Sequence, residues 1–240
     1  MTGVQTCALP IFLIFFIRRS VPEPTVFREA KAGQKYIATG VCSIFVPKML
    51  FRTAFGSLLA IGAQGGYYAI TSWLPTFLRS ERHLTVLGSG GYLAVIIIGS
   101  FVGYLTSAYL SDLLGRRLNF ILFAACSILV VLSYTQLKID DRLMLFLGFP
   151  LGFFASGIFS GMGAFYSELF PTNIRGGAQG FCYNFGRGMA AVFPWLVGVL
   201  SAFLPLGRAI GIYAIIAYVM VTVAALVLPE TKGRDLRYVT

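Results

Sequence analysis

Charged and metal-binding side chains are scarce in this chain of 240 residues. Asp, Glu, Lys and Arg make up 12% of it, only 9 residues are acidic, and there is 1 histidine, His83. Soluble domains carry about 25% charged residues, so the composition argues against a soluble protein. The cysteines, at positions 7, 42, 126 and 182, have no metal-ligand spacing. We therefore expect no metal, no cofactor and no enzyme active site.

Long hydrophobic runs fill the rest of the chain, of which 57% is hydrophobic. A membrane-spanning helix needs roughly 20 mostly apolar residues. The qualifying runs are too long and too uniformly apolar for the alternating strands of a membrane barrel. The sequence therefore predicts an all-α membrane protein with six transmembrane helices at 55–78, 88–110, 118–134, 143–165, 178–203 and 210–228.

The net charge of +10 has an explanation in a membrane. Most Lys and Arg residues precede residue 55, follow residue 228, or lie in the turns near 116 and 175, all on one side of a six-span arrangement. Cytoplasmic loops of membrane proteins are enriched in these residues. We expect a multi-pass protein of the cell membrane, of the bacterial inner-membrane type, with its central loop and C-terminus cytoplasmic. Lipid is then a partner and nucleic acid is not.

Glycines spaced four residues apart occur within the predicted spans. This spacing lets helix backbones approach closely in lipid. The three pairs predict tightly packed helices rather than separate anchors; they are Gly99 with Gly103, Gly148 with Gly152, and Gly157 with Gly161.

The beginning of the chain differs from the rest. FLIFFI at 12–17 is too short to span a membrane and resembles the last turns of a preceding helix, followed by a cytoplasmic central loop at 18–54. Residues 1–11, which contain TGVQTCALPI, resemble the translation of a sequencing-library adapter, so we expect an artefact joined to a truncated gene. A signal peptide is the alternative, but its positive charge should precede the apolar run. The six-helix bundle then occupies 55–228 and a cytoplasmic tail occupies 229–240.

A set of motifs lies at the ends of the predicted spans. They are RRSVPEP at 18–24, GYLTSAYLSDLLGRRLNF at 103–120, SELFPTNIRGGAQGF at 167–181, CYNFGRG at 182–188 and LPETKGRDL at 228–236. In this order the set resembles the C-terminal half of a major facilitator superfamily transporter. Within that superfamily it is most similar to the metabolite:proton symporters, which carry sialate, aromatic acids or other carboxylates. The resemblance covers about 12–240. Ala108 and Leu113 depart from it, where the motif has glycine and arginine.

The resemblance implies a fold and a conformational switch. The six helices would form a 3+3 inverted repeat, with a missing N-terminal six-helix half as partner and a substrate near the bilayer midplane. A charge network at the cytoplasmic side would form in one state and break in the other. Positive-inside anchoring and static surface pairing are the alternatives. The residues implied in the network are Asp112, Gly115, Arg116, Arg117, Glu168, Arg175, Glu230 and Arg234.

Polar residues at helical spacing inside the spans indicate a binding site. Arg187 lies about ten residues into its span, roughly 15 Å deep at 1.5 Å per residue, where a charge is costly unless it faces a wet or paired interior. A guanidinium suits a carboxylate, so we expect a small organic anion as substrate. The alternative is that Arg187 pairs with a backbone carbonyl or with a carboxylate of the missing half. The predicted substrate-binding residues are Gln64, Tyr67, Tyr68, Thr71, Ser156, Ser160, Tyr183, Asn184 and Arg187.

The expected function is that of a truncated secondary active transporter working by alternating access. No acid or histidine lies in the middle of a predicted span, so a proton-coupled symporter would carry its titrating carboxylate in the missing half. A sugar-type or drug-type facilitator of the same superfamily, a channel and a non-transporting membrane subunit are alternatives. A membrane-embedded enzyme is a further one, but no catalytic cluster is visible.

Overall fold

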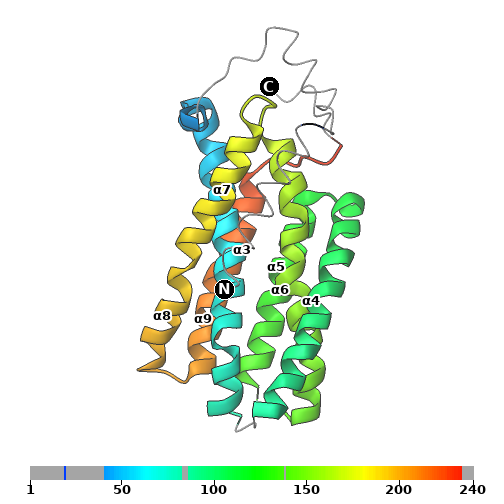
Figure 1. The fold of residues 1–240 in the computed structure, drawn as a ribbon, viewed down its shortest axis with the longest axis vertical. Coiled ribbons are helices and arrows are strands. Elements are labelled where there is room, and N and C mark those ends of the chain that lie inside the picture. Colours follow the sequence, from blue (N-terminus) through cyan, green and yellow to red (C-terminus); the bar gives the residue numbers. More distant parts are fainter. Residues whose placement is uncertain (1–18, 20–40, 83–85, 138, 234–240) are drawn as a thin grey trace. The chain divides into compact units, whose positions relative to one another are not determined.

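A computed structural model describes residue 19 and residues 41–82, 86–137 and 139–233. This part of the chain is helical and contains no strand (Figure 1). The predicted artefact at 1–11 and the predicted helix remnant at 12–17 lie outside the described residues. The elements, in chain order, are η1 (Val41–Phe45), α3 (Pro47–Ser80), α4 (Val86–Leu114), α5 (Arg116–Gln136), α6 (Asp141–Leu169), α7 (Arg175–Ala190), α8 (Val192–Ser201) and α9 (Leu206–Val227).

Two predicted boundaries differ from the structure. Helix α3 begins at Pro47 rather than near residue 55, so it takes up the end of the predicted loop. Proline is favoured in the first helical turn, where its missing N–H is not needed. The fifth predicted span, 178–203, is divided at Ala191. Pro194 explains the break, because its ring displaces the carbonyl four residues earlier and it cannot donate a backbone hydrogen bond.

Helices α4 and α6 pack together closely along their length, as the glycine pairs predict. A Cβ atom on Gly99 would overlap the carbonyl oxygen of Phe149, and one on Gly103 would overlap that of Phe153. In the other direction, a Cβ on Gly152 would overlap the carbonyl oxygen of Ile96. Only glycine permits this backbone contact. These glycines therefore determine that α4 and α6 pack closely against each other.

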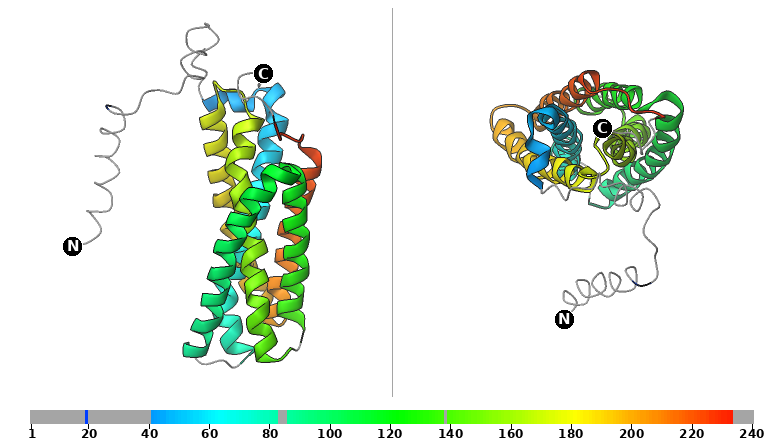
Figure 2. Two further views of the ribbon diagram at one scale, coloured as in Figure 1. Left: turned by 90° about the vertical axis from the view of Figure 1, so that its right-hand side faces the viewer. Right: turned by 90° about the horizontal axis from the view of Figure 1, so that it is seen from above.

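Each of the remaining helices packs on one or more neighbouring helices. Helix α3 packs on α9 and α7, and α5 packs on α9 and α6. Figure 2 shows the helices of this bundle running side by side. Small residues bring α3 close to its neighbours, since a Cβ on Gly62 would overlap the carbonyl oxygen of Ala217 in α9. By contrast, α3 and α6 touch each other only slightly.

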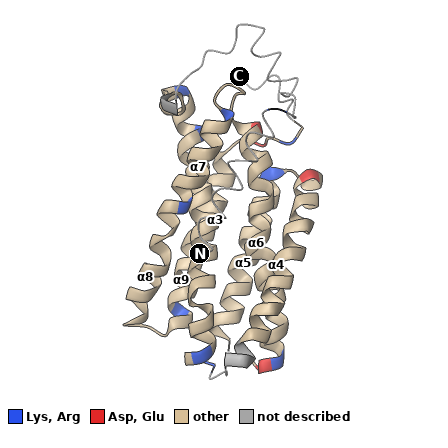
Figure 3. Cartoon of the chain, in the orientation of Figure 1, with Lys and Arg blue, Asp and Glu red and all other residues tan. Residues whose placement is uncertain are grey.

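The surface of the bundle is apolar, as expected for a protein in lipid. Large side chains such as Phe101, Tyr109 and Phe146 are two-thirds or more exposed, which is costly in water. Four helices are long and apolar enough to cross a membrane: α4 from Gly90, α5, α6 and α9. Charged residues gather at the two ends of the bundle, apart from one position in the last turn of α7 (Figure 3). We call these ends the Glu230 end, where α4 ends and α5 begins, and the Glu81 end, where α3 ends and α9 begins.

Candidate functional site

A charged network joins the ends of three helices at the Glu230 end. The Arg116 guanidinium donates from Nη2 to Oε1 of Glu168 (3.0 Å) and from Nε to Oε2 (3.3 Å). These side chains, at the start of α5 and the end of α6, are only 11% and 12% exposed. The same guanidinium donates to Ser111 Oγ (3.0 Å) and to the Asp112 carboxylate, both on α4. One arginine therefore ties α4, α5 and α6 together.

The segment after α9 completes this network by capping α5. The Glu230 carboxylate accepts hydrogen bonds from the backbone N–H groups of Arg116 and Arg117, both at 3.0 Å. A carboxylate is favoured at a helix N-terminus, because the helix dipole is positive there. Burial by itself raises the pKa of Glu230, but four backbone N–H donors outweigh it and lower the pKa from its ordinary value. The Thr231 hydroxyl then donates to Glu168 Oε2 (2.6 Å), which links the cap to the arginine pair.

Gly115 lets the backbone between α4 and α5 turn so that the Glu230 carboxylate can reach the start of α5. Its φ is +98°, a region that side chains disfavour. A Cβ at this position would also lie 2.8 Å from Glu230 Oε2. Lys232 closes the turn from the other side, since its Nζ donates to the carbonyl of Leu113 (2.7 Å) at the end of α4.

The structure thus brings together most of the residues predicted for the network. Arg117 contributes its backbone N–H, as described above. Arg175 lies at the start of α7, where it donates to Thr172 Oγ1 (3.1 Å), and Arg234 lies outside the described residues. Ser111, Thr231 and Lys232 were not predicted, although all three stand inside the quoted motifs.

Among the pockets of the described residues, two lie between helices, away from the charged ends. The Thr71 pocket, of about 210 Å³, lies between α3, α4 and α6; among its lining residues are Tyr67, Thr71, Leu74, Leu93, Ser100 and Ala155. The Gln179 pocket, of about 370 Å³, is nearer the Glu230 end; it is lined by Tyr104, Phe159, Ser160, Met162, Gly163, Tyr166, Gln179 and Tyr183. Concave sites with apolar walls and a few polar groups are typical of small-molecule binding.

The predicted substrate-binding residues do not line one cavity. Tyr67 and Thr71 line the Thr71 pocket, and Ser160 and Tyr183 line the Gln179 pocket. Gln64 is 2% exposed and instead links α3 to α7, because its Nε2 donates to the carbonyl of Tyr183 (3.0 Å).

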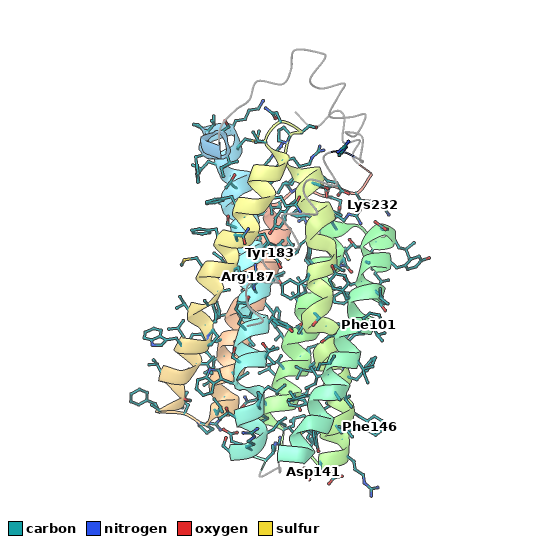
Figure 4. All side chains as sticks on the ribbon, in the orientation of Figure 1. Phe101, Asp141, Phe146, Tyr183, Arg187 and Lys232 are labelled. Carbon is teal, nitrogen blue, oxygen red and sulfur yellow. The ribbon has the colours of Figure 1, made fainter. Side chains whose placement is uncertain are left out.

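The other predicted positions lie beside these two pockets rather than in their walls. Ser156 is buried at 8% exposure on α6, and the Tyr68 ring lies 6.2 Å from that of Tyr67. Asn184 donates to the carbonyl of Gly180 (2.8 Å), one turn earlier in α7. Arg187 is exposed on α7, one turn before the break at Ala191, and Figure 4 shows it one turn along from Tyr183. These two side chains are therefore presented outward from the described bundle.

Several pocket residues were missed by the sequence analysis, among them Gln179, Tyr104 and Phe159. Gln179 precedes Tyr183 by four residues and so lies on the same helix face, where extending the polar pattern by one turn would have found it. Tyr104 and Phe159 carry no such signal, because single aromatic residues are common in apolar helices. Within the described residues, no group of His, Cys, Asp and Glu side chains could hold a metal ion.

Comparison with known proteins places this bundle in a family. The sequence profile of the Major Facilitator Superfamily matches residues 3–141. The chain is 38% identical to the probable 4-methylmuconolactone transporter of Cupriavidus pinatubonensis, over 94% of the chain and 52% of that protein. It is 32% identical to the cis,cis-muconate transport protein of Acinetobacter baylyi, over 81% and 48% of the two chains.

A third relative has a different named substrate. The sialic acid transporter NanX of Escherichia coli is 29% identical over 83% of the chain and 48% of that protein. The chain therefore spans about half the length of these curated relatives. All three are named as transporters, which confirms the prediction that the chain is not an enzyme. With an all-helical bundle, four helices able to cross a membrane and a matching family profile, the chain belongs to the Major Facilitator Superfamily.

Proposed function

We propose that this chain is the C-terminal six-helix half of a secondary transporter that moves a small organic anion by alternating access. The observation that carries this proposal is a pair of cavities with hydroxyl and amide groups inside an otherwise apolar bundle. The transport names of relatives about twice as long support it. The partner is then a second bundle of six helices, N-terminal to this one.

In this proposal α3 and the α7–α8 pair also cross the membrane, and the six helices form a 3+3 inverted repeat. Two acids at opposite ends support the repeat. Glu168, at the end of α6, accepts from Arg116 at the start of α5. Glu81, at the end of α3, accepts from the backbone N–H of Gly207 at the start of α9 (3.1 Å). An inverted repeat that pairs α3 with α6 and α5 with α9 makes these two contacts equivalent.

The proposed substrate is a small carboxylate or a related metabolite. Residues on both pockets and on the adjoining faces would contribute to its site, as predicted from the sequence. Arg187 is exposed and lies twelve residues along from Arg175, roughly 18 Å at 1.5 Å per residue. We place it at the boundary with the missing half, where a guanidinium could bind the substrate carboxylate. Relatives named for muconate and sialic acid transport support this class.

Proton coupling and a conformational switch complete the proposal. The coupling proton would be carried by a residue of the missing half, because acidic residues on the described bundle lie at its ends (Figure 3). The Arg116–Glu168 pair and its Glu230 cap would form when the Glu230 end is closed and separate when it opens. That end is then cytoplasmic, in the inner membrane of a bacterium, since it carries more of the described bundle's Lys and Arg residues than the Glu81 end does.

An uptake assay tests this function. Cells expressing the gene that carries this chain, with any upstream reading frame included, are given labelled cis,cis-muconate and labelled sialate with and without a protonophore. Saturable uptake that the protonophore abolishes supports the proposal. Uptake of a sugar, or efflux of a drug, favours the alternative facilitators, and non-saturating flux favours a channel. A long sequencing read across the codon for Phe12 tests separately whether residues 1–11 are an artefact.

A further inference from the structure

The two cavities are stacked along the same helices, one turn apart. On α4, Ser100 lines the Thr71 pocket and Tyr104 lines the Gln179 pocket. On α6, Ala155 lines the Thr71 pocket and Phe159 lines the Gln179 pocket. Residues four apart are separated by about 6 Å along a helix axis. The pockets therefore follow one another along the α4–α6 pair.

A pair of aromatic rings stands between these pockets. The Tyr67 ring, from the Thr71 pocket, meets the Phe159 ring, from the Gln179 pocket, with centroids 5.5 Å apart and an interplanar angle of 89°. This edge-to-face geometry is a favourable one for aromatic side chains. Since each ring belongs to the wall of a different pocket, their contact lies where the two pockets adjoin.

The helices that carry the two rings are weakly joined to each other. Helix α3 packs mainly on α9 and α7, whereas α6 packs mainly on α4 and α5. Their direct hydrogen bonds lie closer to the Glu230 end, where Tyr166 Oη donates to the carbonyl of Gly56 (2.8 Å) and Arg52 donates to that of Leu169 (3.1 Å). A small displacement of α3 from α6 would thus part the rings without breaking the close α4–α6 or α3–α9 packing.

We propose that Tyr67 and Phe159 form an internal gate between two successive substrate positions, an inference that rests on the transport function proposed above. A ligand in the Thr71 pocket would meet the hydroxyls of Thr71 and Ser100 beside apolar walls. Past the gate it would meet the Gln179 amide and the Tyr183 phenol. Both positions combine a few polar groups with apolar walls, and the substrate passes between them only while the rings are apart.

The accessibility of single cysteines tests the gate without requiring a known substrate. In a background with every cysteine replaced by serine, Ser100→Cys reports on the Thr71 pocket and Ser160→Cys on the Gln179 pocket. A membrane-impermeant maleimide is applied to sealed cells and to inverted vesicles. With the gate intact, we expect each reporter to react from one side of the membrane only, and the two from opposite sides.

Removing either ring should abolish this sidedness. In Phe159→Ala, and independently in Tyr67→Ala, labelling of each reporter from its far side should approach the rate from its near side. Tyr67→Phe keeps the ring and should retain one-sided labelling.

Phe154→Ala is the matched control on α6, because that ring packs on Phe123 and Phe153 and lines neither pocket. The gate is rejected if the two ring-removal variants stay one-sided like this control, or if both reporters already react from both sides in the intact protein. Neither result depends on uptake, so a failure of the transport assay remains distinguishable.

Discussion

The Arg116 guanidinium donates hydrogen bonds to three side chains, and the burial of each partner decides how much that contact stabilises the fold. The Glu168 and Arg116 side chains are largely buried, whereas the Asp112 side chain is 73% exposed. A hydrogen bond to a buried charge contributes substantially to stability, but an exposed ion pair is screened by water and contributes little. The stability of this corner should therefore depend on Glu168 much more than on Asp112.

Glu168→Ala should destabilise the folded bundle by about 2 kcal/mol, because the Arg116 guanidinium and the Thr231 hydroxyl both lose their acceptor. Asp112→Asn, the control on the same arginine, should cost less than about 1 kcal/mol. Thermal unfolding of the purified protein in detergent measures both. Equal losses in the two variants would show that burial does not govern this network.

At the scale of the helices, glycine contacts govern which elements can separate. Gly103 packs against the backbone of Phe153, so α4 and α6 move as one unit. A Cβ atom added to Gly188 on α7 would meet no other atom of the described residues within 4 Å. The α4–α6 pair is thus fixed by contact, while this part of α7 is not.

Gly103→Ala should consequently be costly, by about 1–3 kcal/mol, as expected when a packed interface is overfilled. Gly188→Ala is the matched control and should be neutral or slightly stabilising, because alanine favours a helix over glycine. Unfolding in a graded mixture of mild and denaturing detergents compares the two. A destabilised Gly188→Ala with an unaffected Gly103→Ala would contradict the packing described here.

The Glu230 cap should make the stability of the α5 start depend on pH. The pKa of this carboxyl is lowered from its ordinary value of 4.5, so the stabilisation is present in full above pH 4.5 and is lost as the pH falls through the lowered pKa. Glu230→Gln should unfold at a lower temperature than the native chain at pH 7, and the difference should shrink below pH 4.5. A difference that is constant with pH would show that the charge on Glu230 is not what holds the cap.

The sequence predicted the helices better than the directions of their side chains. Helices α4, α5, α6 and α9 match predicted spans closely, because the length of an apolar run sets where a helix can cross lipid. The start of α3 and the break at Ala191 were missed, since each depends on one proline rather than on hydropathy. Helical spacing predicted which residues share a face, but it could not show that Gln64 turns to the Tyr183 carbonyl while Asn184 and Arg187 point outward.

At the scale of the whole molecule, the outward direction of Arg187 is the strongest reason to look beyond this bundle. If α7 and α8 cross the membrane together, as proposed above, the Arg187 guanidinium near their junction needs a wet or paired surrounding. The described residues give it no hydrogen-bond or ion-pair partner, and the relatives carry about as much chain again. A site completed by a second bundle would place this charge next to the substrate.

Arg187→Lys should then weaken uptake of an organic anion, by about tenfold in apparent affinity, because a lysine cannot form the paired hydrogen bonds of a guanidinium with a carboxylate. Amounts of protein in the membrane should stay the same, since the side chain is exposed and supports no contact within the bundle. Arg208→Lys is the control, an exposed arginine at the Glu81 end, and should transport normally. Concentration-dependent uptake of labelled muconate in cells measures both variants. Undiminished affinity in Arg187→Lys would remove Arg187 from the site and would favour its pairing with a carboxylate of the other half, which lysine could maintain.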